Sequence, residues 1–330
     1  MCYMPGVSRE YDAEGMTFII NHINGIGRTL RRLNPRALIF LPVLLLLLTA
    51  ACSSDAEEPI ISDEQEAGGP DYSAVIITTD MAVGSNRIVF GIIDRDGMPV
   101  HAEASEVSAY FLVPREDARE IKGSATAQFV SWPSSVGGVF VAEVDLDTAG
   151  AYQLDVNSTS SDGTSVFAQA SFILKETSST PAIGAPAPPS MTHTVVKAED
   201  ISHITSSLEP DPALYEFSIL EALQQAKPLV IVFATPAFCV SATCGPQVGE
   251  LNKVKDKVGD KANYIHVEVF ENPHLLEGAR PAGGLVPAVD EWGLPTEPWT
   301  FIIDSQGLVY AKFEQFTSAE QIEAKLLEIS

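Results

Sequence analysis

The chain has 330 residues, which suggests two domains and provides enough apolar residues for two cores. Aspartate and glutamate total 44 against 20 lysines and arginines, for a formal net charge of −24. A surface this acidic repels phosphate backbones, so nucleic-acid binding is excluded as the main function. The 4 cysteines fit neither a disulfide-dense scaffold nor a four-cysteine zinc site. We expect no metal and no cofactor.

The first 51 residues have the pattern of a secretion signal. Residues 37–51 read ALIFLPVLLLLLTAA, an uncharged apolar run that follows a cluster of arginines. A membrane-spanning helix needs about 20 apolar residues, so this shorter run suits the central region of a signal peptide. Small residues lead into Cys52, which resembles the lipobox of bacterial lipoproteins, in which that cysteine is lipidated and becomes the new N-terminus. We therefore expect residues 1–51 to be removed. The lipid on Cys52 would then hold the protein on the outer face of the cell membrane. The alternatives are a plain cleaved signal peptide or an uncleaved membrane anchor.

Removal of residues 1–51 changes both the charge and the cysteine count. That segment holds five arginines and three acids, so the mature chain keeps 41 acids against 15 bases, a net charge of −26. With Cys2 removed and Cys52 lipidated, only Cys239 and Cys244 remain as thiols. In an oxidising compartment a close pair of this kind is expected to be bridged or redox-active.

The mature chain divides by composition. Residues 52–71 are polar and acidic and predict a disordered tether. Residues 72–175 hold seven β-rich runs and predict an antiparallel sandwich: 72–79, 86–93, 105–113, 126–132, 138–144, 151–156 and 165–174. The segments IIDRDGMPV and DTAGAYQLDV resemble the Ig-like modules of bacterial exported proteins, which implies a spacer or a protein-binding module. Residues 176–192 are rich in proline and predict a semi-rigid linker.

Residues 193–330 alternate between helix and strand. An amphipathic pattern predicts a helix over 211–227, and the apolar run PLVIVFA at 228–234 is typical of a strand buried on both faces. The later elements are predicted in chain order as a helix at 245–259, a strand at 263–270, a hairpin at 299–316 and a helix at 318–329. With a cysteine pair directly after the first strand, this is the order of a thioredoxin fold, so we expect an all-β sandwich followed by an α/β domain.

The segment TPAFCVSATCGP, together with EPWTFIID at 297–304, resembles the extracytoplasmic thioredoxin-like family of the TlpA type. The resemblance covers nearly half of the chain. It implies that Cys239 is the nucleophile, that Cys244 resolves the mixed disulfide, and that Pro298 lies in a cis peptide facing the cysteines and docks the substrate. Neighbouring residues of the same motifs are Phe238, Gly245, Pro246, Glu297 and Trp299.

The cysteine spacing departs from that family, which has C-x2-C where this chain has C-x4-C. On a regular helix, positions i and i+5 lie about 140° apart, too far round for a disulfide. A bridge therefore requires Cys239 in the loop ahead of the helix and Cys244 at its start, with Pro246 near the first helical position, where proline is favoured. Helix N–H groups there would stabilise a thiolate, whereas a carboxylate at Glu297 would raise the thiol pKa.

The function predicted from these features is a membrane-anchored, extracytoplasmic thiol–disulfide oxidoreductase that acts on disulfides of client proteins. A non-catalytic binding module with a structural disulfide is one alternative. A peroxiredoxin-like peroxidase is another, because TPAFC is similar to a TPGC-type motif, although Thr235 stands four places before Cys239 and Val232 replaces an expected proline. A copper-handling protein of the Sco type would need a histidine beside the thiolates, and His266 reads as an ordinary strand residue.

Overall fold

The structure is a computed structural model that describes residues 70–132, 137–239, 243–277 and 280–330. The predicted signal peptide, Cys52 and nearly all of the predicted tether lie outside these residues. Within the described part, no helix is both long enough and apolar enough to cross a membrane.

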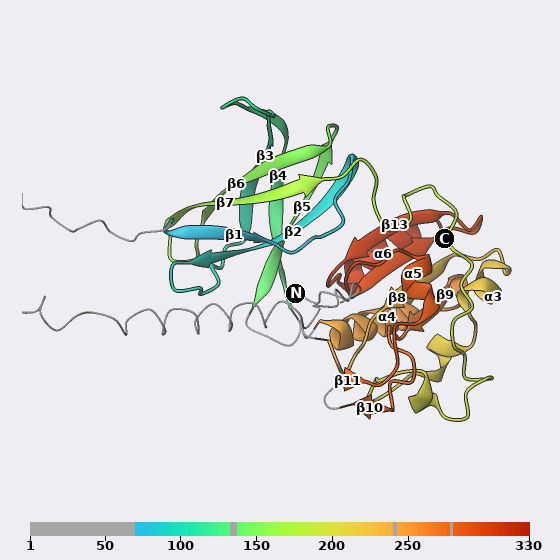
Figure 1. The fold of residues 1–330 in the computed structure, drawn as a ribbon. Coiled ribbons are helices and arrows are strands. Elements are labelled where there is room, and N and C mark those ends of the chain that lie inside the picture. The colour runs from blue at the N-terminus through green and yellow to red at the C-terminus, as the bar shows by residue number, and fades with distance from the viewer. Residues whose placement is uncertain (1–69, 133–136, 240–242, 278–279) are drawn as a thin grey trace, which may run out of the picture. The chain divides into compact units, whose positions relative to one another are not determined.

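Residues 72–174 form one seven-stranded antiparallel sheet, drawn from blue to yellow-green in Figure 1. Its strands are β1 Tyr72–Ile76, β2 Gly84–Asp94, β3 Ala104–Leu112, β4 Arg119–Ser131, β5 Gly138–Leu146, β6 Gly150–Thr159 and β7 Ser165–Leu174. All seven predicted strands are confirmed, and this part of the chain is a β-rich domain. The order across the sheet is β1-β2-β5-β4-β3-β6-β7, so β5 returns between β2 and β4.

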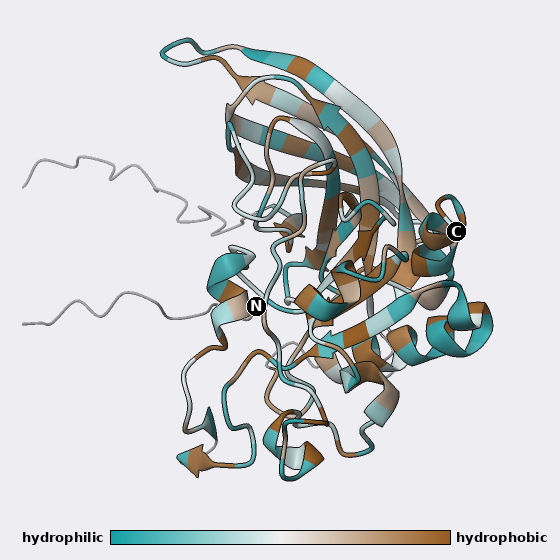
Figure 2. Ribbon diagram, turned by 90° about the vertical axis from the view of Figure 1, so that its right-hand side faces the viewer, coloured by the Kyte–Doolittle hydropathy of each residue, from teal (hydrophilic) through white to brown (hydrophobic). Residues whose placement is uncertain are grey.

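The core of the β-rich domain follows from the two-residue repeat of its strands. On β6, Tyr152, Leu154 and Val156 point to one face of the sheet and have 0% exposure. Hydropathy alternates along the strands in the same way (Figure 2). The strand predicted at 126–132 begins earlier, at Arg119, because the polar segment 119–125 pairs along β3. Cross-strand hydrogen bonds, which composition does not reveal, extend this strand.

Residues 229–314 contain a four-stranded sheet in the order β13-β12-β8-β9. The strands are β8 Leu229–Phe233, β9 Asn263–Val267, β12 Trp299–Ile303 and β13 Val309–Glu314. β8 runs parallel to β9 and antiparallel to β12, and β12 is antiparallel to β13. Every residue of β8 is buried, as its continuous apolar run predicts. Every residue of β9 and β12 is buried as well. Two strands of two residues each, β10 Leu276–Glu277 and β11 Arg280–Pro281, pair antiparallel in the segment after β9.

Helices cover both faces of this sheet. Val230 and Val232 of β8 share a core with α4 Cys244–Val258 and α6 Ala319–Leu327. Leu229, Ile231 and Phe233 share the other core with α3 Ile219–Leu223 and α5 Pro287–Glu291. Three short 3-10 helices complete the described elements: η2 Ile201–His203, η3 Pro212–Tyr215 and η4 Gly259–Lys261. Because successive strand residues point to opposite faces, β8 contributes to both cores and fixes the position of the loop that follows it.

The continuous helix predicted over 211–227 is wrong. The chain forms η3, leaves the helical conformation, and restarts at α3. Ser218 has an extended backbone and caps α3, since its hydroxyl accepts from the Glu221 N–H while the Glu221 carboxylate accepts from the Ser218 N–H at 2.8 Å. This reciprocal capping box defines a new helix N-terminus, and Phe217 just before it stays 36% exposed.

The predicted linker has no helix or named strand, but its middle is held by backbone hydrogen bonds. The N–H of Gly184 donates to the Val309 carbonyl at 2.7 Å, and the N–H of Val309 donates to the Ala185 carbonyl at 2.9 Å. Ala187 donates to the Gly307 carbonyl at 2.9 Å. Residues 184–187 therefore lie alongside the start of β13.

Candidate redox site

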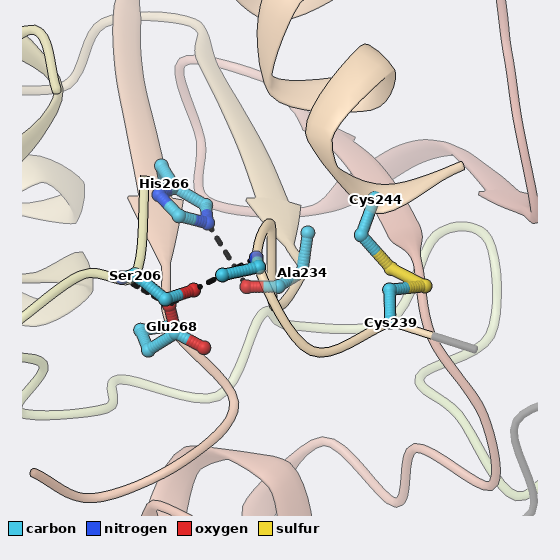
Figure 3. The surroundings of a disulfide bond; sticks show 7 residues. Ser206, Ala234, Cys239, Cys244, His266 and Glu268 are labelled. Atoms are coloured by element: carbon cyan, nitrogen blue, oxygen red, sulfur yellow. Dashed lines mark hydrogen bonds between the residues drawn. A yellow bond between two sulfur atoms is a disulfide. The ribbon is translucent and has the colours of Figure 1, made fainter. Parts of the chain in front are cut away.

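Cys239 and Cys244 form a disulfide at the junction of β8 and α4 (Figure 3). Cys239 lies in the loop after β8, and Cys244 is the first residue of α4, with the two Cα atoms 5.9 Å apart. Pro246 is then the third helical residue. The predicted placement of the two cysteines is thus confirmed, and the pair is bridged.

The two cysteines differ in how far they are exposed to solvent. Cys244 has 0% exposure and belongs to the core under α4, whereas Cys239 is only partly buried at its edge. Cys244 also occupies the helix N-terminus, where the positive end of the helix dipole favours a thiolate. Because Cys239 is the more exposed of the two, an incoming group would reach it first.

The loop that carries Cys239 is fixed at its base. The N–H of Ala234 donates to the Val267 carbonyl at 3.1 Å, which extends the β8–β9 ladder by one residue. Phe238 and Gly245, both predicted neighbours of the pair, are half-buried. A Cβ on Gly245 would lie 3.6 Å from the Pro236 carbonyl oxygen, an ordinary contact, so the local backbone does not require glycine here.

Glu297 lies beside the disulfide, and Pro298 follows it in the chain. The peptide bond between them is cis. A carboxylate oxygen of Glu297 and the two sulfur atoms all lie within 4.8 Å of one another. Glu297 is buried, and this burial raises the pKa of its carboxyl group to about 7. Near neutral pH the group is partly protonated, so it raises the thiol pKa less than a full negative charge would.

A second buried carboxyl group, on Glu268, follows β9 and was not predicted as a site residue. Its Oε2 atom accepts from both the N–H and the hydroxyl of Ser206, each at 2.7 Å. The Ser206 hydroxyl oxygen in turn accepts from the Ala237 N–H at 3.2 Å, so Glu268 is connected through Ser206 to the cysteine loop (Figure 3). Burial raises the pKa of Glu268, and its charge adds to the rise at Glu297.

His266 is a structural residue of β9. Its Nε2 atom is 3.0 Å from the Ala234 carbonyl oxygen and its Nδ1 atom is 2.6 Å from the Tyr215 hydroxyl. A carbonyl only accepts, so Nε2 carries the hydrogen and Nδ1 accepts from Tyr215. Burial lowers the pKa of His266 to about 4. Both ring nitrogens are occupied, so in this conformation His266 does not supply the histidine that a copper site of the Sco type needs.

Trp299 belongs to the core on the other face of the sheet from Cys244. It is 2% exposed, it stacks on Phe301 at 5.6 Å, and its indole N–H donates to the Thr296 hydroxyl at 3.3 Å. Although it directly follows Pro298, its side chain serves packing.

No protein-family profile and no curated protein matches the sequence. Among solved structures, a chloroplastic thioredoxin z is 18% identical, over 33% of this chain and 82% of that one, with a TM-score of 0.25. Murine CRIg is 11% identical over 31% of this chain and 96% of that one, with a TM-score of 0.20. MtrC from Shewanella baltica OS185 is 11% identical over 72% of this chain and 51% of that one, with a TM-score of 0.25. With all three TM-scores below 0.5, conclusions about this chain rest on its own geometry.

Proposed function

We propose that the chain is an extracytoplasmic thiol–disulfide oxidoreductase of the thioredoxin-like, TlpA type that acts on the disulfides of client proteins. The observation that carries this proposal is the disulfide at the β8–α4 junction, with Cys239 partly exposed and Cys244 fully buried. The sheet order β13-β12-β8-β9, with β8 parallel to β9 and a terminal hairpin and helix, supports the thioredoxin-like assignment.

The exchange needs no group beyond the two cysteines and a client. In the reduced protein, the Cys239 thiolate attacks one sulfur of a client disulfide; the client S–S bond breaks and one client thiolate leaves. Cys244 loses its proton and attacks the Cys239 sulfur, which releases the second client thiolate and forms the Cys239–Cys244 bond. Two electrons pass from the pair to the client, and the reverse sequence oxidises a client dithiol.

A permanent structural disulfide is the competing assignment. The bridged residues are only 5 positions apart. Closing a loop this short stabilises the fold by about 2 kcal/mol, the low end of the range for disulfides. The bond contributes little as a cross-link, which supports a chemical role over a structural one.

Trapping of the mixed disulfide tests the proposal. In the full chain with Cys2→Ser and Cys52→Ser, we expect Cys244→Ser to accumulate a covalent complex with a disulfide-containing client protein, because nothing then resolves the bond to Cys239. Non-reducing electrophoresis and mass spectrometry measure the complex, and it should dissociate on adding a thiol reductant.

The matched control is Cys239→Ser in the same background. It retains the buried Cys244 and should trap at least about 10-fold less complex, because Cys244 has 0% exposure. Equal trapping by the two variants, or a wild-type disulfide that is reduced only on unfolding, would show that the bond is structural.

We further propose that residues 72–175 are an Ig-like spacer or binding module. The sheet order places β1, β2, β5 and β4 together and then β3, β6 and β7. This is the order of strands A-B-E-D and C-F-G in the two sheets of an Ig-type sandwich, with the third and fourth strands also paired here.

Anchoring through a lipid on Cys52 is the proposed attachment to the membrane. After expression in a bacterial host, we expect Cys52→Ser to move the protein from the membrane fraction to a soluble or unprocessed form, and mass spectrometry to find the lipid on wild-type Cys52 only. Cys2→Ser is the matched control and should change neither result. Wild-type protein that carries no lipid on Cys52 and keeps residues 37–51 in the membrane would instead indicate that these residues act as an uncleaved anchor.

A further inference from the structure

Three potential metal ligands converge at the disulfide. Among the residues that the structure describes, Cys239, Cys244 and Glu297 are the one group of three whose ligand atoms all lie within 4.8 Å of one another. Glu297 is 5% exposed, and its Oε2 atom has no hydrogen-bond partner. A buried, unpartnered carboxylate oxygen is costly unless it gains a proton or a cation.

Reduction of the disulfide turns this cluster into a ligand set. Two thiolates and one carboxylate oxygen are donors that Zn²⁺ accepts, at about 2.3 Å for sulfur and about 2.0–2.2 Å for oxygen. Around a tetrahedral ion these lengths separate the ligand atoms by roughly 3.5–4 Å, so the observed cluster needs only a small rearrangement. The C-x4-C spacing also falls within the range found for zinc ligands.

The electrostatics favour a cation at the same place. Glu268 is 3% exposed, its Oε1 atom also lacks a hydrogen-bond partner, and its charge acts on Glu297. Two thiolates beside Glu297, with the charge of Glu268 acting on Glu297, would concentrate negative charge at this site. A divalent ion bound to three of these four groups would offset that charge.

We propose that Cys239, Cys244 and Glu297 form a three-ligand site for Zn²⁺ when the pair is reduced, with the fourth coordination position open to water. The site goes beyond the proposed function, because it needs reduced thiols but no client. Oxidation of the two thiolates releases the zinc ion. A client disulfide accepts two electrons and its S–S bond breaks, while the Cys239–Cys244 bond forms. The metal would thus occupy the dithiol form and be absent from the disulfide form.

Zinc binding to the full chain tests this site. The protein would carry Cys2→Ser and Cys52→Ser, be solubilised in detergent, and be reduced with a phosphine under anaerobic conditions. Titration with Zn²⁺ against a chromophoric chelator should give one ion per chain, and Co²⁺ should give the absorption of a sulfur-ligated tetrahedral ion. Reoxidised protein should bind neither ion.

The Glu297 variants separate this three-ligand site from simple binding to two thiols. We expect Glu297→Gln to weaken Zn²⁺ binding at least about 10-fold and Glu297→Asp to recover part of the loss. Glu277→Gln, at an exposed carboxylate on β10, is the matched control and should bind as the parent does. Circular dichroism checks that each variant is folded.

Three results would overturn the zinc site: unchanged affinity in a folded Glu297→Gln protein, one ion shared by two chains, or binding of Cu⁺ without Zn²⁺. Zinc binding and client trapping are measured separately, so either can fail while the other holds. If the reduced protein binds Zn²⁺ but never traps a client, the zinc site is supported and the proposed oxidoreductase function is contradicted.

Discussion

Replacing Phe301 by alanine is expected to lower the free energy of unfolding by about 4 kcal/mol, the range for removing a buried aromatic ring. Phe301 of β12 has 0% exposure. Its ring lies 4.7 Å from that of Trp292, 5.6 Å from Trp299 and 6.0 Å from Phe233, so the substitution leaves a cavity at the centre of an aromatic cluster. Urea unfolding followed by tryptophan fluorescence measures the loss, because two of these neighbours are tryptophans.

Phe167→Ala is the control for this substitution. Phe167 lies on β7 of the β-rich domain and is 52% exposed, so the same truncation should change the free energy of unfolding by less than about 1 kcal/mol. A loss below about 1 kcal/mol for Phe301→Ala would show that the aromatic cluster is not a packed core in solution.

Between pH 7.5 and 4, His266 is expected to lower the free energy of unfolding of the wild type by about 3 kcal/mol. The His266→Gln variant should not show this decrease. Burial lowers the pKa of His266 to about 4 in the folded protein, whereas an unfolded histidine titrates near 6.5. Below about pH 6.5 the unfolded chain takes up a proton that the folded chain does not, so wild-type stability falls as the pH drops toward 4. Urea unfolding at a series of pH values from 7.5 to 4 measures the effect.

The comparison with the variant isolates His266 from the groups around it. Glu268 and Glu297, whose pKa values are raised by burial, are present in both proteins, so the difference between the two free energies should keep only the histidine contribution. Between pH 7.5 and 4, the free energy of unfolding of the wild type should fall by about 3 kcal/mol more than that of His266→Gln. Parallel curves would mean that His266 is charged in the folded state or is reached by water.

Local patterns in the sequence predicted most strands of this protein. The apolar run at 228–234 predicted a strand buried on both faces, because an exposed strand would alternate between polar and apolar residues. The hairpin at 299–316 followed from its turn, where Asp304 accepts from the N–H groups of Gln306 and Leu308, each at 2.9 Å. Both depend on residues close in sequence, which is why they could be predicted without knowledge of the fold.

The error at 211–227 also has a local cause. Ser218-Ile219-Leu220-Glu221 fits the S-x-x-E pattern of a capping box, so a helix start was visible inside the predicted helix. The apolar spacing from Leu214 to Ala226 suggested one continuous helix. The hydrogen-bonding capacity of Ser218 overrides that periodicity, because a cap satisfies helix N–H groups that would otherwise be unpaired.

The candidate site was predicted only where it has a sequence motif. The cysteine motif and the segment at 297–304 identified Cys239, Cys244 and Glu297, whereas Glu268 and Ser206 belong to no motif and meet the loop through tertiary contacts. One signal could have indicated Glu268, since it follows β9 directly and the carboxyl ends of parallel neighbours β8 and β9 meet at one edge. Ser206 had no such signal.

The pairing of β8 with β12 has a consequence for how a new chain is made. Strand β12 lies between β8 and β13, and Trp299 pairs with Phe233 across this contact. Synthesis proceeds from the N-terminus, so Cys239 and Cys244 leave the ribosome before β12 and Glu297 exist. Until the C-terminal hairpin arrives, β8 has at most one neighbouring strand and the core around Cys244 is incomplete. Both thiols are therefore less enclosed before the C-terminal hairpin is in place than in the folded protein.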